Sequence, residues 1–253
     1  MAPKTHTKPL KVFYTPSLLP ESKDESFNSE YNIFLKTVES VNNLSLLYET
    51  TRAGEKGPAS HSQQDLYRAM LIFACAGLDV FFKKLIQTKL SKLINHSDTA
   101  SQEVFKNWIA NRLKKPEELL NTVALALTDI NPRETFIKQY IENMTGNSLQ
   151  SYQQLYIVCN ASGLQTKKIL KEKALDEAFS VRNKIIHEMD INSSENPSKT
   201  KGYRTRNTRT RHDMEKHTRV ILDLIQDSFS AYKTKFKELN IETKKEKIEK
   251  ART

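Results

Sequence analysis

The sequence predicts an all-α fold, because apolar residues recur at three- and four-residue steps and glycine is scarce. The chain has 253 residues, of which 38% are apolar and only 6 are Gly. Few glycines disfavour the tight turns of a β-sandwich, and this apolar content is enough to build a core. We expect one helical domain over residues 27–240, between a flexible N-terminal arm (1–26) and a charged tail (241–253).

The N-terminal arm is predicted from its prolines, which favour an extended chain. Pro3, Pro9, Pro16 and Pro20 stand there among Lys and Ser, and no apolar run typical of a signal peptide is present. The first helix is expected from Glu30 to a point before Gly54. Its apolar positions follow a helical repeat: Ile33, Phe34, Val38, Val41, Leu44 and Leu47.

The next helix is the most apolar one, and we expect it to be the central strut of the fold. Ser62 is its predicted cap, and it extends to Leu93 and Ile94. Its apolar run from Ala69 to Leu78 is too short to cross a bilayer, so a buried helix is predicted.

Shorter helices are expected in the middle of the chain, where proline and glycine mark helix ends. We interpret residues 97–160 as a helical insertion between two halves of a bundle. The predicted helices run from Ser101 to Leu113, from Pro116 to Thr128, from Pro132 to Met144, and from Leu149 to Val158.

Two long helical patterns close the chain. One begins at Thr166 and carries a single buried stripe, including Phe179, Ile186 and Met189, that stops near Ile191. After a loop, the last helix is predicted to start with Asp213 as its cap and to continue to Phe236.

Charge and cysteine content narrow the function classes. Forty Lys and Arg against thirty Asp and Glu give a net charge of +10, which favours a polyanionic partner; a basic surface without a ligand is the alternative. Cys75 and Cys159 alone provide no disulfide framework or zinc cluster, which favours a reducing cytoplasm. We expect no cofactor and no metal. The phosphate-binding, dinucleotide-binding, HExxH and GxSxG motifs do not occur.

Two charges interrupt apolar helix faces. Arg182 lies near the middle of the arc formed by Leu175, Phe179 and Ile185, where an unpaired guanidinium would be costly. Asp79 is a matching acid in the most apolar helix. We infer that the two helices pack and that Asp79 orients Arg182, leaving donors for a phosphate. An ordinary buried ion pair without a catalytic role is the alternative.

Asn183 and His187 stand four residues apart, and therefore on one face of the helix beside Arg182. A lone histidine on a helix is usually a surface residue. His187 differs because a cation and an amide accompany it, so these three side chains are predicted to line one groove.

These residues resemble the HEPN superfamily, whose signature is an Arg, a polar residue and a later His on a late helix. Residues 182–187 fit it, and residues 70–79 are similar to the earlier helix that carries an acid, often Glu where this chain has Asp79. The RiboL-PSP-HEPN subgroup is nearest. The resemblance covers residues 62–235, although 97–160 match no part of the family.

The resemblance implies metal-independent RNA cleavage, in which the 2′-hydroxyl attacks the adjacent phosphate and leaves a 2′,3′-cyclic phosphate and a 5′-hydroxyl. His187 would move a proton, Arg182 would hold the phosphate and Asn183 would orient either. It also implies a homodimer, and a toxin or antiphage-defence effector restrained by an antitoxin or sensor protein.

The loop after this motif is predicted to bind RNA. Residues 198–211 hold six cations, no acid and one tyrosine that could stack on a base. The predicted RNA-binding residues are Lys184, Lys199, Lys201, Tyr203, Arg204, Arg206, Arg209 and Arg211. A solvated charge run is the alternative for this loop.

Two rival functions remain open at the level of sequence. One is a catalytically silent HEPN module that binds RNA, a nucleotide or a partner protein. The other is a helical DNA-binding or scaffold protein, for which the sequence holds no recognition-helix pattern.

Overall fold

The computed structural model describes residues 12–17, 25–96, 98–114, 116–192 and 205–241. In these residues it contains nine α-helices, one short 3-10 helix and a single isolated β-bridge, and no strand. The predicted all-α fold is confirmed. None of the described helices combines the length and apolar character needed to cross a membrane.

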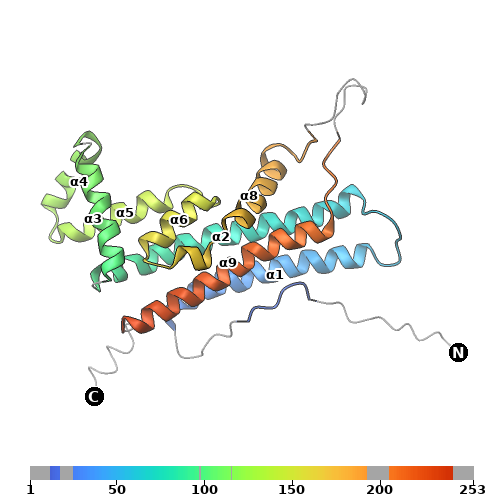
Figure 1. Ribbon diagram of the computed structural model, residues 1–253, viewed down its shortest axis with the longest axis horizontal. Coiled ribbons are helices and arrows are strands. Elements are labelled where there is room, and N and C mark those ends of the chain that lie inside the picture. Colours follow the sequence, from blue (N-terminus) through green and yellow to red (C-terminus); the bar gives the residue numbers. More distant parts are fainter. Residues whose placement is uncertain (1–11, 18–24, 97, 115, 193–204, 242–253) are drawn as a thin grey trace, which may run out of the picture.

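Three long helices form the body of the molecule (Figure 1). They are α1 (Asn28–Thr51), α2 (His61–Asn95) and α9 (Arg211–Glu238). The 3-10 helix η1 (Glu25–Phe27) precedes α1. Helix α2 packs along both α1 and α9, which makes it the central strut that its apolar sequence predicted. Helix α8 (Glu172–His187) packs on α2 and α9 near the middle of the body.

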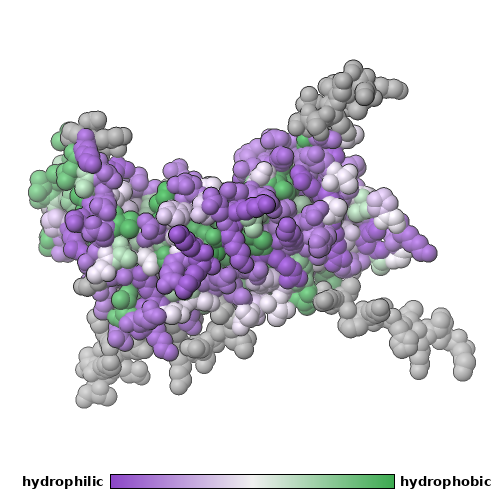
Figure 2. All heavy atoms as spheres, in the orientation of Figure 1, coloured by the Kyte–Doolittle hydropathy of each residue, from purple (hydrophilic) through white to green (hydrophobic). Residues whose placement is uncertain are grey.

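A lobe of shorter helices gathers at one end of the body, around the C-terminal half of α2 (Figure 1). It consists of α3 (Thr99–Leu113), α4 (Pro116–Thr128), α5 (Pro132–Thr145) and α6 (Tyr152–Ala161). The short α7 (Thr166–Ile169) leads from the lobe to α8. Figure 2 shows green, apolar residues at the far tip of this lobe, where Figure 1 places α4. Leu120 and Leu127 of α4 are exposed, as is Ile130, which follows α4.

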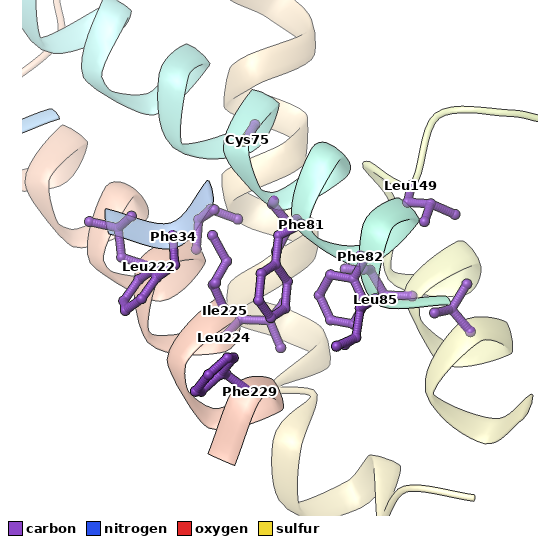
Figure 3. Packing of buried hydrophobic residues seen from close by; sticks show 14 of the residues in the cluster. Phe34, Cys75, Phe81, Phe82, Leu85, Leu149, Leu222, Leu224, Ile225 and Phe229 are labelled. Carbon is purple, nitrogen blue, oxygen red and sulfur yellow. The ribbon is translucent and has the colours of Figure 1, made fainter. Parts of the chain in front are cut away.

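The core lies between α1, α2 and α9, with aromatic residues along α2 (Figure 3). Phe81 and Phe82 are fully buried, as are Phe34 of α1 and Ile225 of α9. Burial of each such side chain contributes about 1.5–3 kcal/mol. The apolar periodicity that predicted the helices therefore also identified the faces that meet.

The helix caps differ from those predicted by two or three residues. Ser60 Oγ accepts a hydrogen bond from the Gln63 backbone N–H, and the Gln63 side chain accepts one from Ser60, so Ser60 and not Ser62 caps α2. Asp98 caps α3 by accepting from Ser101, and Thr210 caps α9 by accepting from Asp213. Ser101 and Asp213, which were predicted to begin α3 and α9, are the third residues of these helices. The backbone N–H of a third helical residue has no partner within the helix and needs an acceptor upstream.

Part of the predicted N-terminal arm is packed. Phe13 and Tyr14 are buried, and the Arg219 guanidinium lies 4.4 Å from the centroid of the Phe13 ring. The Tyr14 hydroxyl donates to Asp223 at 2.9 Å, and Asn42 bonds both backbone groups of Tyr14. Residues 12–17 thus lie along α1 and α9, while residues 1–11 and 18–24 of the arm, and 242–253 of the tail, fall outside the described residues.

Candidate active site and its charged surroundings

Helix α8 presents Asn183, Lys184 and His187 to solvent. Its buried face consists of Leu175, Ala178, Phe179 and Ile185, which pack toward α2 and α9. Asn183 and His187 are one helical turn apart on the exposed face, as their spacing predicted. His187 is the last residue of the helix, so its position depends on how the helix ends.

Helix α8 is shorter than the predicted stripe. The extended backbone of Leu170 separates α7 from α8, and α8 ends at His187. Met189 was predicted to be buried, but it has a φ of 50° and is exposed. Two left-handed residues, Met189 and Asp190, turn the chain away from the helix axis, which periodicity cannot foresee.

Arg182 lies half-buried between α8 and α2. Its Nη1 donates to Asn183 Oδ1 at 2.9 Å, and its Nε is buried without a hydrogen-bond partner among the described residues. Burial raises the pKa of the Cys75 thiol on α2 to about 12, and the positive charge of Arg182 opposes that rise. The guanidinium is therefore close to α2 and keeps donors that no described protein group uses.

The predicted pairing of Asp79 with Arg182 is wrong. Asp79 Oδ2 forms an ion pair with Lys83 at 2.9 Å, one turn further along α2. Its Oδ1 accepts a hydrogen bond from the backbone N–H of Leu149 at 2.6 Å, which ties the lobe to α2. Asp79 was predicted to pair with Arg182 because it is the acid in an apolar stretch of α2. Its carboxylate instead has two other partners, a lysine four residues later on the same helix and a backbone N–H from a distant segment.

The described cations of the basic loop are paired, although the loop contains no acid. Arg206 pairs with Asp65 of α2 at 2.8 Å, and Arg209 pairs with Asp190 at 2.6 Å. Arg211 pairs with Glu215 at 2.6 Å and also with Glu49 of α1. The expectation that these three are free for phosphates is corrected, because acids from other elements reach them. Lys199, Lys201, Tyr203 and Arg204 lie outside the described residues, and Lys184 is exposed.

A buried charged cluster follows directly after His187. Asp190 is 0% exposed and Arg68 of α2 is 2% exposed, with Arg68 Nε 2.8 Å from Asp190 Oδ2. Burial alone would raise the pKa of Asp190, but hydrogen bonds from Arg209, Arg68 and Asn207 outweigh it and hold that pKa below its usual value.

Sequence reasoning missed this cluster, although a signal existed. Arg68 interrupts the apolar side of α2 one turn before Leu71 and two turns before Cys75, which is the same kind of anomaly that marked Arg182. Its partner could not be chosen from sequence, because Asp190 is 122 residues away.

The base of the basic loop is closed beside this cluster. Asn207 N–H donates to Asp190 O at 2.7 Å, and Asn192 N–H donates to Thr205 O at 2.8 Å. These bonds flank the bridge between Ile191 and Arg206. Asn192 and Thr205 are thereby held next to each other near the end of α8.

An exposed apolar face lies on α2 beside α1. Phe73 is 50% exposed and Val80 is 51% exposed, and they stand two turns apart on one side of the helix. With Ala76 and Gly77 they form one wall of a shallow groove whose other wall is α1. Ile186 of α8 is also a partly exposed apolar residue, one turn from Arg182.

Among the described side chains, no three His, Cys, Asp or Glu residues gather so that they could hold a metal ion. The candidate site consists of a guanidinium with unused donors, an amide that accepts from it, and a solvent-exposed imidazole. These groups can bind an anion and transfer a proton.

An all-α body that presents Arg182, Asn183 and His187 on a late helix is the arrangement of a HEPN domain. The chain matches the RiboL-PSP-HEPN family over residues 34–234, and it belongs to that family. The match begins in α1, earlier than the resemblance at residue 62, and it extends across residues 97–160, whose status as an insertion stays an interpretation. Comparison with curated proteins and with solved structures gives no significant match. HEPN domains commonly bind RNA and are often nucleases, although some are catalytically inactive.

Proposed function

We propose that this protein is a metal-independent endoribonuclease with Arg182, Asn183 and His187 in its active site. The observation that carries the proposal is the Arg182 guanidinium, which lies beside Asn183 and retains donors without a described protein partner. Such a guanidinium is suited to a phosphate, whose oxygens accept from two N–H groups at once.

In the proposed reaction, His187 takes the proton of a ribose 2′-hydroxyl. The 2′-oxygen then bonds to the adjacent phosphorus and the bond to the 5′-oxygen breaks. A proton returns to the leaving 5′-oxygen, from His187 or from the same residue of a second copy. The products are a 2′,3′-cyclic phosphate and a 5′-hydroxyl, and Arg182 stabilises the charge that builds on the phosphate oxygens.

Asn183 takes the orienting role that Asp79 was predicted to have. Its Oδ1 accepts from Arg182 Nη1, so the amide fixes one edge of the guanidinium. Asp79 is engaged with Lys83 and Leu149 and has no part in the proposed mechanism.

The test is incubation of purified protein with mixed RNA in EDTA, followed by analysis of the fragment ends. We expect cyclic phosphate and 5′-hydroxyl ends from the wild type. The His187→Ala variant should lose roughly two to four orders of magnitude in rate, because proton transfer is removed. His212→Ala is the matched control, since His212 is also exposed and lies outside the motif. Equal rates for His187→Ala and the wild type would overturn the proposal, and RNA binding without cleavage would favour a silent HEPN module.

A homodimer is part of the proposal, with the apolar face of Phe73 and Val80 covered by a second copy. Both residues are about half exposed on α2, and the composite cleft between two motifs is the part of this proposal that the family resemblance supplies. Phe73→Ser should convert a dimer to a monomer in light scattering. Leu127→Ser is the control, because Leu127 is exposed on α4, in the lobe. A wild type that is monomeric at micromolar concentration and still cuts RNA contradicts the composite cleft.

The biological role proposed is that of a toxin or antiphage-defence effector, held in check by an antitoxin or sensor protein. This role follows from the family resemblance. Cys75 and Cys159 are both free and buried, which is compatible with the proposed reducing cytoplasm.

A further inference from the structure

The carboxylate of Asp190 holds together three parts of the chain. Arg68 of α2 donates from Nε at 2.8 Å, and Arg209, which precedes α9, donates from Nη2 at 2.6 Å. The Asn207 side chain adds a hydrogen bond at 3.1 Å. Asp190 itself follows the last residue of α8 by three positions, so the end of α8 is attached to α2 and to the segment that returns from the basic loop.

The last turn of α8 is closed by the backbone N–H groups of Glu188 and Asp190, which both donate to the Lys184 carbonyl, and the second of these bonds depends on the attachment of Asp190. Met189 and Asp190 have φ angles of 50° and 56°, which residues other than glycine adopt only at a cost in free energy. Helix ends also fray, since their last carbonyls have no partner within the helix. Here the Lys184 carbonyl accepts from Asp190 N–H at 2.8 Å, and that bond exists only while Asp190 keeps its left-handed position.

We propose that Asp190 is a positioning residue for RNA cleavage, which fixes His187 through Arg68 and Arg209. This inference rests on the proposed nuclease function. His187 is the terminal residue of α8, so a loosened last turn would move its imidazole more than it would move Arg182, one turn and more upstream. Displacement of a catalytic group by about 1 Å can lower a rate roughly 100-fold.

A second buried ion pair provides a matched comparison. Glu30 and Lys89 are 0% and 3% exposed and 3.3 Å apart, and they join α2 to α1 near the lobe end of α2. Twenty-one positions separate Arg68 from Lys89 on α2, a distance of about 30 Å along a helix. Loss of either pair should destabilise the fold, but only the Asp190 cluster contacts the segment that carries His187.

The experiment compares Asp190→Asn with Glu30→Gln in the full chain, at a temperature well below the melting point of both. We expect both variants to lower Tm, and only Asp190→Asn to lower kcat, by about 10- to 100-fold. Amide hydrogen exchange over residues 184–191 should become faster in Asp190→Asn and stay unchanged in Glu30→Gln. An unchanged kcat and unchanged exchange in Asp190→Asn would overturn the inference.

Two further arms keep the outcomes separate. If Asp190→Asn does not fold, Arg209→Gln replaces it, because Arg209 is 19% exposed and leaves Asp190 paired with Arg68. If the wild type does not cut RNA, the nuclease proposal fails, and the positioning of this segment is still decided by hydrogen exchange. Faster exchange would then support the anchor without its catalytic consequence, and unchanged exchange would overturn both.

Discussion

The two halves of α2 have opposite surroundings. Toward the lobe, Phe81, Phe82 and Leu85 are fully buried among apolar side chains (Figure 3). Toward its N-terminus, α2 carries the buried Arg68, which pairs with Asp190 after α8, and the half-exposed Asp65, which pairs with Arg206 before α9. One half of the helix thus holds the fold together by apolar contact, and the other forms ion pairs with the segments that follow α8 and precede α9. A substitution in each half should therefore affect different properties.

The largest effect is expected at Arg182, where the role of charge can be separated from that of folding. Arg182→Ala should lower the rate of cleavage by roughly 100-fold or more, which corresponds to a loss of about 3 kcal/mol of transition-state stabilisation, because the phosphate loses its cation. Asp79 is already paired with Lys83, so Arg182→Ala should leave no orphaned acid on α2. Asp79→Asn added to Arg182→Ala should then give no recovery of Tm, as measured by calorimetry. A clear recovery would mean that Asp79 and Arg182 interact after all.

A smaller effect is expected from pH on the charged half of α2. The pKa of Asp190 is below its usual value in the folded chain, so its carboxylate stabilises the fold at neutral pH. That contribution is lost as the pH falls through the lowered pKa, below about pH 4. The difference in unfolding free energy between the wild type and Asp190→Asn should be of the order of 3 kcal/mol at pH 7 and shrink in acid.

Asp65→Asn is the control for this titration. The pKa of Asp65 is also lowered: burial opposes the shift, and Arg206 and Arg68 outweigh it. Its side chain is half exposed, so solvent screens the pair and the effect should be within about 1 kcal/mol. Equal pH profiles for the two variants would show that the burial of Asp190 brings no extra stability.

The smallest effect is expected in the salt dependence of RNA binding. Replacement of Lys199, Lys201 and Arg204 by Gln should flatten the salt slope by about one unit for each phosphate that the side chains no longer neutralise. Arg211→Gln should change the slope less, because Glu215 and Glu49 already neutralise that cation. Filter binding over a range of salt concentrations would measure both. A larger change for Arg211→Gln would mean that RNA displaces its acidic partners.

The sequence predicted the helices and their buried apolar faces better than it predicted the partners of the charged side chains. Periodicity placed the long helices and the buried faces, since apolar burial depends on repeat and not on one partner. The caps were missed by two or three residues, because Ser60, Asp98 and Thr210 compete with equally suitable neighbours. Arg182, Asn183 and His187 were brought onto one helix as expected.

The partners of charges were not predictable in the same way. Asp79 and Arg182 both interrupt apolar faces, and we predicted that they pair, although Lys83 stands four residues after Asp79 on the same helix and was visible in the sequence. The Leu149 backbone donor comes from a distant segment and could not be predicted. Arg206 and Arg209 were assigned to RNA because their own loop has no acid, while Asp65 and Asp190 lie far away in the chain. An ion pair between different segments depends on tertiary distances that one sequence does not contain.

The close approach of α1 and α2 at Gly77 has a consequence for mutational tolerance. A Cβ atom at this position would lie 2.1 Å from Thr37 Oγ1 and 2.7 Å from Thr37 Cβ, so even one added methyl group would force the helices apart. Such overpacking costs about 1–3 kcal/mol. Gly77 also borders the groove beside Phe73, so its replacement would widen the spacing of the face proposed for the second copy. In a library of single variants, this partly exposed position should therefore be as restricted as a fully enclosed one.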